Sequence, residues 1–288
     1  MSRSRGFPAS EASLEMPAPR SGDAERRVRT ALAGASPDGT PVALWGSLPG
    51  APPSGEGYVR QTLEFDAACG SCDLLKLANG LPLFAAGAES FGWEAERLRD
   101  LVRIGRLVGD GGVPRIETVP GVGETLRRWP QDDPERLAKA LAAWAWAAVA
   151  EGGCAGVMLV LPEPEWSEAD AGILKAARDA GGWCQIVHFH GPEAPPNEVL
   201  TQADGVSGPW EALVALPETL CRVGGINERR LARRPVEEVG GEARRAEEWA
   251  AQARCGLILA PGCAIPPGVS GDRLRAVRDA AKRVSPQT

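Results

Sequence analysis

The sequence predicts an α/β protein whose chain forms a single-domain (β/α)8 TIM barrel, and three observations support this fold. Short β-type runs recur along the 288 residues, and polar or alanine-rich stretches with helical spacing separate them. Strands that alternate with helices pair in parallel through right-handed crossovers. Eight such runs are present, which favours a closed barrel. An open doubly wound sheet is the alternative, because one miscounted strand would remove the argument for closure.

The expected strands lie, in chain order, at 41–46, 73–79, 115–121, 156–162, 184–191, 205–210, 221–227 and 255–263. Two helices between them have clear boundaries. The first begins at Asp133-Pro134 and ends before Gly152-Gly153. Its inward stripe consists of Leu137, Leu141, Trp144 and Ala148. The second begins near Ser167 and ends at Gly181-Gly182.

Two further helices are expected near the C-terminal end of the chain. One follows Gly240-Gly241, and the last covers 272–284. Their inward residues are Ala243, Ala246, Ala250 and Ala253 in the first and Leu274, Val277 and Ala281 in the second. The helices after the fifth and sixth expected strands are short, and the segment 85–109 fits more than one element.

Composition bounds the domain organisation and the classes of partner. The first 22 residues are rich in Ser, Pro and Arg without the apolar core of a secretory signal, so we expect a disordered tail over 1–23 and the barrel over 24–288. A net charge of -6 argues against nucleic-acid and anionic-membrane surfaces, and no apolar run is long enough to cross a bilayer. Seven cysteines without framework spacing predict a reducing, cytoplasmic location.

The two histidines of the chain, His188 and His190, end an apolar run. Residues i and i+2 of a strand point to the same face, so both imidazoles converge at the C-terminal end of the expected strand 184–191. Active sites of barrels are built at this end of the strands. We therefore predict that His188 and His190 are catalytic or metal-binding. The alternative is a pair of half-buried histidines bonded to backbone carbonyls.

Cys263 follows the last expected strand and precedes a Pro-Pro turn. If the barrel closes, its thiol meets the two imidazoles at the same end of the strands. Two imidazoles and one thiolate with a vacant fourth position match a catalytic zinc site. A packed, inert cysteine is the alternative interpretation.

Other candidate residues are weaker. Trp45, Asn79 and Asn227 each end an expected strand and are predicted to line a substrate pocket. Glu163 is a candidate fourth metal ligand, although its Glu-Pro-Glu context is also that of an ordinary solvated loop. The sequence from Cys69 to Cys72 has the C-x-x-C form, but it precedes the second expected strand and so lies at the opposite end of the barrel.

Several segments resemble the uroporphyrinogen decarboxylase superfamily, which includes corrinoid-dependent methyltransferases. The resemblance covers RVRTALAGASPDGTPVALW at 27–45, DLLKLANG at 73–80, EGGCAGVMLV at 151–160, QIVHFHG at 185–191 and LILAPGCAIPPGVSGDRLRAVRDA at 257–280. The last segment is similar to the terminal Gly-Cys-x-Ile-Pro signature of that superfamily. This resemblance implies a (β/α)8 barrel over nearly the whole chain.

The chain resembles the methyltransferase branch better than the decarboxylases. The arginine motif expected after the first strand is absent, and Asn79-Gly80 stands where decarboxylases have an aspartate. The methyltransferase branch holds zinc through a His-x-Cys pair and a later cysteine. His188 and Cys263 match two of these ligands, and His190 stands where the remaining cysteine would be.

The resemblance therefore implies a zinc-dependent methyltransferase-like enzyme acting on a small molecule. The chain lacks the Asp-x-His-x-x-Gly motif of corrinoid-binding modules, so any corrinoid would be supplied by a partner protein. Two alternatives stay open: a metal-free carboxy-lyase of tetrapyrrole biosynthesis with the histidines as general acids, and a non-catalytic barrel that binds a tetrapyrrole or a protein partner.

Overall fold

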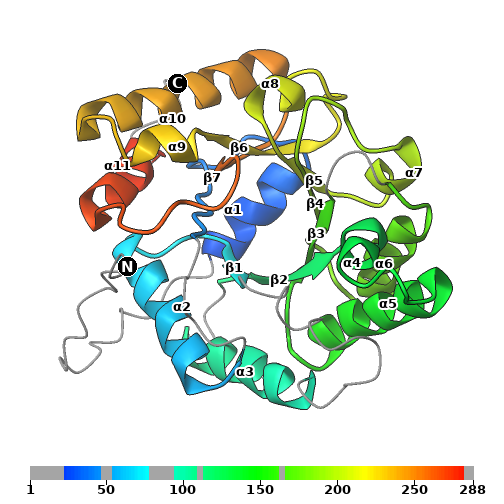
Figure 1. Ribbon diagram of the computed structural model, residues 1–288. Helices are drawn as coiled ribbons and strands as arrows, with labels where there is room; N and C mark the ends of the chain where they lie inside the picture. The colour runs from blue at the N-terminus through cyan, green and yellow to red at the C-terminus, as the bar shows by residue number, and fades with distance from the viewer. Residues whose placement is uncertain (1–22, 47–53, 78–93, 109–112, 162–165, 282–288) are drawn as a thin grey trace, which may run out of the picture.

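The protein is described by a computed structural model at residues 23–46, 54–77, 94–108, 113–161 and 166–281 (Figure 1). Its described strands form a seven-stranded parallel sheet in the order β1 to β7, so that chain neighbours are also sheet neighbours. The strands are β1 Leu75–Leu77, β2 Arg115–Pro120, β3 Gly156–Leu161, β4 Ile186–Phe189, β5 Gly205–Ser207, β6 Cys221–Ile226 and β7 Leu257–Pro261. The sheet curls into a half-barrel, and the α/β class with parallel pairing is confirmed.

The segment 41–46, expected as the first strand, does not form a regular strand. Isolated parallel bridges join Val42 to Leu259 and Gly46 to Ile265, next to β7. On its other side, the carbonyl of Val42 accepts hydrogen bonds from the backbone amides of Asp73 and Leu74, before β1. The segment thus lies between the two edge strands, where the regular strand expected over 41–46 is not formed, and the closed eight-stranded barrel is not confirmed.

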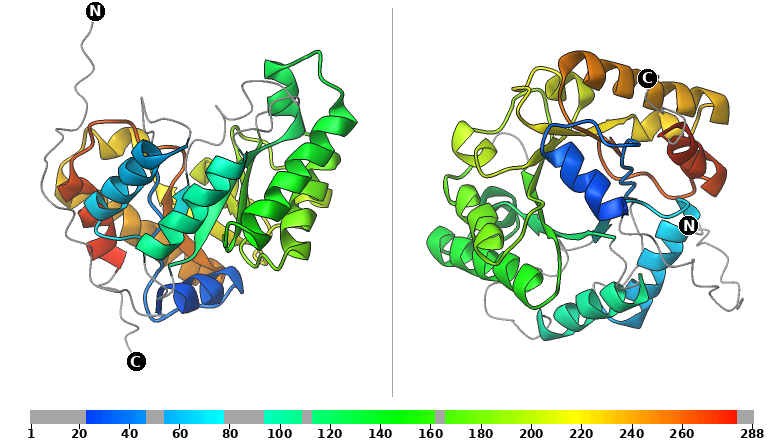
Figure 2. Two further views of the ribbon diagram at one scale, coloured as in Figure 1. Left: turned by 90° about the horizontal axis from the view of Figure 1, so that it is seen from below. Right: turned by 180° about the vertical axis from the view of Figure 1, so that it is seen from behind.

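Eleven helices lie in the described part of the chain. They are α1 Asp23–Leu32, α2 Glu56–Ala68, α3 Glu94–Leu107, α4 Val122–Arg128, α5 Pro134–Ala150, α6 Ala169–Asp179, α7 Asn197–Leu200, α8 Trp210–Leu213, α9 Glu228–Leu231, α10 Val236–Ala253 and α11 Gly271–Ala281. The longer helices α2, α3, α5, α6, α10 and α11 surround the sheet on its outside (Figure 1). Helix α1 instead lies across one end of the ring of strands (Figure 2).

Helix α1 caps the N-terminal end of the strands. Val28 and Ala31 belong to the interior cluster that includes Ile116, Ile186 and Ile258. The backbone of α1 comes so close to β7 that a Cβ built on Gly256 would lie 1.7 Å from the carbonyl oxygen of Ala31. This end of the barrel is therefore plugged, and the opposite end carries the loops that follow the strands.

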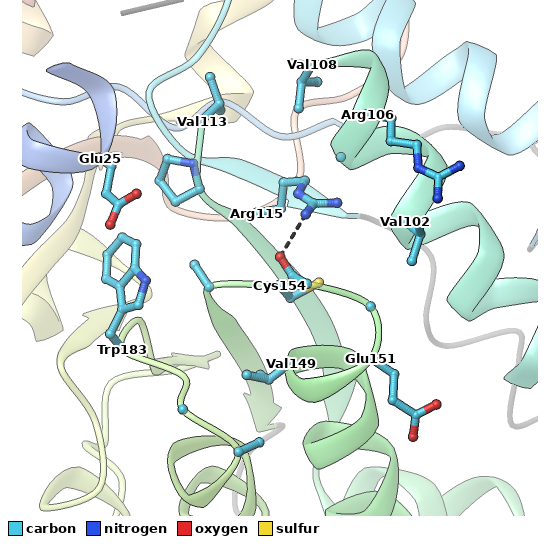
Figure 3. Close-up of a pocket in the computed structure, with 17 residues that line it drawn as sticks. Glu25, Val102, Arg106, Val108, Val113, Arg115, Val149, Glu151, Cys154 and Trp183 are labelled. Carbon is cyan, nitrogen blue, oxygen red and sulfur yellow. Dashed lines mark hydrogen bonds between the residues drawn. The ribbon is translucent and has the colours of Figure 1, made fainter. Parts of the chain in front are cut away.

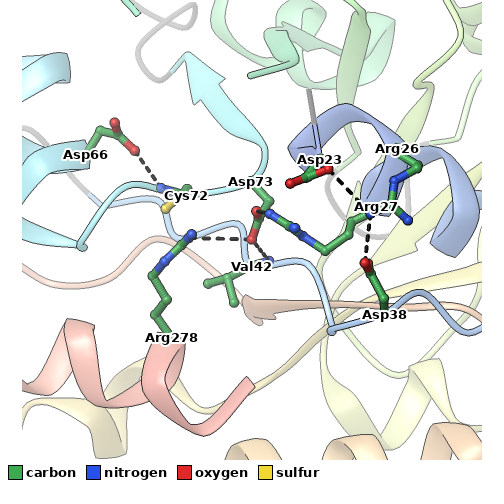
Figure 4. Close-up of polar contacts among 9 residues, drawn as sticks. All are labelled: Asp23, Arg26, Arg27, Asp38, Val42, Asp66, Cys72, Asp73 and Arg278. Atoms are coloured by element: carbon green, nitrogen blue, oxygen red, sulfur yellow. Dashed lines mark hydrogen bonds and ion pairs between the residues drawn. The ribbon is translucent and has the colours of Figure 1, made fainter. Parts of the chain in front are cut away.

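Asp73 ties the irregular segment 41–46 to the rest of the barrel (Figure 4). Its carboxylate accepts a hydrogen bond from the Val42 backbone amide at 3.0 Å and forms ion pairs with Arg27 of α1 and Arg278 of α11. The side chain of Asp73 is only 5% exposed, so these partners offset the cost of burying its charge.

The sequence predicted two helices well and misplaced the start of a third. Helix α5 begins at the N-cap Asp133, whose side chain accepts from the Arg136 backbone amide, and α6 follows Ser167 as expected. Helix α10 begins at Val236 and includes Gly240-Gly241, which the sequence analysis placed before the helix. Pro235 at its N-cap fixes the entry, and Gly240 lies beside Ala280 of α11.

Part of the expected organisation lies outside the described residues. This holds for the tail at 1–22 and for 282–284 of the last expected helix, which is described as far as Ala281. Helices α7 and α8 are short, as predicted, and α3 occupies much of the ambiguous segment 85–109. None of the helices in the described ranges is long and apolar enough to cross a membrane.

Candidate metal centre

The two histidines lie at the C-terminal end of β4. His188 is 3% exposed, and its Nδ1 lies 3.1 Å from the hydroxyl oxygen of Ser207 on the neighbouring strand β5. The Nε2 atoms of His188 and His190 lie 2.9 Å apart, with the rings nearly perpendicular at 86°. Both imidazoles therefore point to one spot, as the i and i+2 spacing predicted.

Cys263 reaches the same spot from the loop after β7. Its Sγ lies 3.7 Å from the Nε2 of His190, although 73 residues separate them in the chain. One ligand atom from each of His188, His190 and Cys263 lies within 4.8 Å of the others. The structure thus brings together the three residues that the sequence analysis singled out, which we call the His-His-Cys cluster.

The charges in the His-His-Cys cluster are coupled. The hydrogen bond between His190 and Cys263 raises the pKa of the imidazole and lowers the pKa of the thiol. Burial lowers the pKa of His188, and the positive charges of Lys76 and His190 act in the same direction. These shifts favour the thiolate–imidazolium form of Cys263 and His190 and the neutral form of His188, whose uncharged ring can bind a metal through nitrogen.

The donor atoms fit a zinc ion. In tetrahedral sites zinc binds imidazole nitrogen at about 2.0–2.1 Å and thiolate sulfur at about 2.3 Å, which sets the donors on the order of 3.5 Å apart. The separations of 2.9 and 3.7 Å are close to this geometry, and the remaining separation, at most 4.8 Å, would have to shorten to reach it. The Ser207 hydroxyl next to Nδ1 of His188 is the kind of second partner that directs Nε2 toward a metal.

The other predicted site residues fall into three groups. Trp45 is 2% exposed inside the barrel, and its indole Nε1 has no acceptor within the described residues. Asn227 caps helix α9, where its Oδ1 accepts from the backbone amides of Arg229 and Arg230. Asn79 and Glu163 lie outside the described residues, so their predicted roles stay predictions.

Three charged residues near the cluster were not found from the sequence. Lys76 lies at the centre of β1, and its charge acts on both histidines. Glu124 of α4 raises the pKa of His190, and Glu228 of α9 acts on Cys263. The available signal was the position of Lys76 inside the apolar run Leu-Leu-Lys-Leu, because lysine is rarely buried in a strand unless its charge is paired. The two glutamates follow strands and carried no distinguishing pattern.

Two other features lie at the far end of the barrel. Cys69 and Cys72 are buried and precede β1, in agreement with the expected position of the C-x-x-C sequence. A pocket of about 520 Å³ lies beside the N-terminal ends of β2 to β4 and is lined by Arg115, Cys154 and Trp183 among others (Figure 3). Neither feature shares a residue with the His-His-Cys cluster.

No protein-family model matches this sequence, and no curated protein matches it at the level of sequence. Among solved structures, it is similar to a methyltransferase from Methanosarcina mazei with a TM-score of 0.66 and 16% identity, covering 90% of this chain and 98% of that one. A DUF72 family protein from Thermotoga maritima aligns with a TM-score of 0.41 and 13% identity, covering 82% of this chain and 98% of that one. The first likeness shows that this chain shares its barrel-like fold with a methyltransferase.

Proposed function

We propose that this protein is a zinc-dependent, methyltransferase-like enzyme. The observation that carries the proposal is the convergence of His188, His190 and Cys263 within 4.8 Å at the C-terminal end of the barrel. Barrel enzymes place their chemistry at this end. The fold shared with a methyltransferase supports the same conclusion from the whole chain.

Each residue of the His-His-Cys cluster has a distinct role in this proposal. His188 binds through Nε2 while Ser207 holds its ring, and His190 and Cys263 supply the other two ligands. Zinc, when bound, lowers the pKa of a substrate thiol and so prepares the nucleophile that accepts a methyl group. Three protein ligands leave the fourth position for that substrate. With two imidazoles and one thiolate, the cluster donates less negative charge than one with two thiolates.

The methyl donor is proposed to be a separate corrinoid protein. Both histidines of this chain belong to the cluster, so none is left to ligate a corrinoid. Six of the seven cysteines are buried, and none of the seven forms a disulfide in the described structure, which supports the expected reducing, cytoplasmic compartment. Glu163 remains our proposed fourth protein ligand for the state without substrate, and Trp45, Asn79 and Asn227 our proposed pocket residues.

Metal analysis tests the proposal. We expect about one zinc per chain in protein purified without a histidine tag, and loss of most of it in Cys263→Ala and His188→Ala variants. Cys255→Ala is the matched control, because Cys255 is a free cysteine before β7 at the other end of the barrel. Protein that contains no zinc and takes up none on titration would overturn the proposal. Decarboxylation of uroporphyrinogen by such metal-free protein would support the lyase alternative.

A further inference from the structure

Strand β1 directs one charged side chain into the barrel interior. Leu75 and Leu77 pack in the core between the sheet and the helices, whereas Leu74 belongs to the interior cluster. Because side chains alternate along a strand, Lys76 points inward with Leu74. Its Nζ lies 5.1 Å from the centroid of the Trp45 ring, which confirms this direction.

The ammonium of Lys76 belongs to the surroundings of the His-His-Cys cluster. Its charge lowers the pKa of both His188 and His190, and the charge of Cys263 acts on Lys76 in turn. Burial lowers the pKa of Lys76 to about 8, so the side chain is still mostly charged near pH 7. A cation thus lies in the same barrel interior as the His-His-Cys cluster, near enough for its charge to act on both imidazoles.

The described residues provide no carboxylate partner for this cation. Glu117, a carboxylate that acts on Lys76, points to the other face of the sheet and forms a fully buried ion pair with Arg97. Glu124 and Glu228, near the cluster, are paired with arginines of their own helices. Lys76 is nevertheless partly exposed, so a ligand can reach it. An unpaired charge in a barrel interior is costly unless a counter-charge arrives.

We propose that Lys76 forms an anion-binding subsite for the carboxylate or phosphate group of the substrate whose reacting end lies at the His-His-Cys cluster. The aromatic face of Trp45 supports the ammonium from one side. That the other end of the substrate reacts at the His-His-Cys cluster rests on the proposed function. The preference of the Lys76 subsite for a negatively charged group does not. A bound divalent metal with one thiolate and two neutral imidazoles would add to the positive field.

Alkylation of Cys263 measures this preference without a known substrate. The other six cysteines are buried, so Cys263 is the thiol that reagents reach in the folded protein. The ratio of the rates with anionic iodoacetate and neutral iodoacetamide reports the local charge, because the thiolate fraction cancels in the ratio. In chelator-treated, full-length protein we expect this ratio to fall about tenfold in Lys76→Met, the size of effect that one nearby charge produces. Lys76→Arg should keep the ratio.

Lys175→Met is the matched control, because it removes the same charge from an exposed site on α6 and should leave the ratio unchanged. Propionate, but not propionamide, should also slow the reaction of the wild-type protein at constant ionic strength, and this protection should disappear in Lys76→Met. A ratio that differs less than about twofold between wild type and a folded Lys76→Met overturns the subsite. Absence of zinc would overturn the proposed function alone, since alkylation needs no metal.

Discussion

At the scale of residues, the site depends on one hydrogen bond between two side chains. Cys263 and His190 lie 3.7 Å apart, and the bond favours thiolate and imidazolium over the neutral pair. A metal ion would replace the shared proton, so zinc binding should strengthen as pH rises and protons leave His190 and Cys263. The same pair makes Cys263 a nucleophile when no metal is bound.

This pairing predicts the pH dependence of Cys263 alkylation. The pKa of the thiol is lowered by its hydrogen bond with His190, so in metal-free protein the rate with iodoacetamide should reach half its maximum at a lower pH than for a cysteine without such a neighbour. His190→Asn removes the imidazolium and should move this midpoint upward. Mass spectrometry of labelled peptides measures the rates. An identical midpoint in wild type and variant would show that His190 does not activate the thiol.

The sequence predicted the His-His-Cys cluster because strand alternation and the position of strand ends are local patterns. Lys76 stands out locally as a charge in an apolar run, but its role depends on what lies across the barrel, on Trp45 and the cluster, which the run itself does not show. Asn227 was predicted as a pocket residue, which stays a prediction, and the structure adds a role that the sequence did not predict, since its side-chain oxygen caps α9.

At the scale of elements, glycine decides how closely α1 approaches β7. Gly256 precedes β7 and has no room for a Cβ against the carbonyl of Ala31. Gly172 on α6, by contrast, has no atom within 4 Å of the position that a Cβ would take. Alanine at Gly256 therefore measures the cost of a steric clash, whereas alanine at Gly172 measures the intrinsic preference of a helix for alanine over glycine.

We predict opposite effects of alanine at these two positions. Gly256→Ala should lower the free energy of unfolding by about 3 kcal/mol, because α1 must move away from the end of the barrel. Gly172→Ala should raise it by about 0.5–1 kcal/mol, since alanine loses less backbone entropy in a helix. Urea denaturation followed by circular dichroism measures both. Equal stability of the two variants would contradict the packing of α1 against β7.

At the scale of the whole molecule, the segment 41–46 decides how far the barrel closes. The apolar run at 41–46 has the same hydrophobic pattern as the seven confirmed strands. Such a pattern does not show whether the two neighbouring strands form a continuous series of backbone hydrogen bonds with the segment. Its position depends on the long-range partners of Asp73, which come from α1 and α11 at opposite ends of the chain. The alternation of strands and helices was therefore predictable, and the irregular closure was not.

Hydrogen exchange tests this closure. Asp73→Ala removes the acceptor of the Val42 amide and the partner of Arg27 and Arg278, so peptides covering 41–46 should exchange about tenfold faster or more. Peptides covering β4 should keep their protection. Asp272→Ala is the control, because that carboxylate is 77% exposed and pairs only within α11 among the described contacts. Unchanged protection at 41–46 in Asp73→Ala would show that the bridges to β7 hold the segment without Asp73.

X-ray absorption at the zinc edge of tag-free protein shows whether His188, His190 and Cys263 bind zinc together. We expect two imidazole nitrogens at about 2.0–2.1 Å and one sulfur at about 2.3 Å, with the sulfur lost in Cys263→Ala. A shell of oxygen atoms alone, or of several sulfurs from other cysteines, would contradict it.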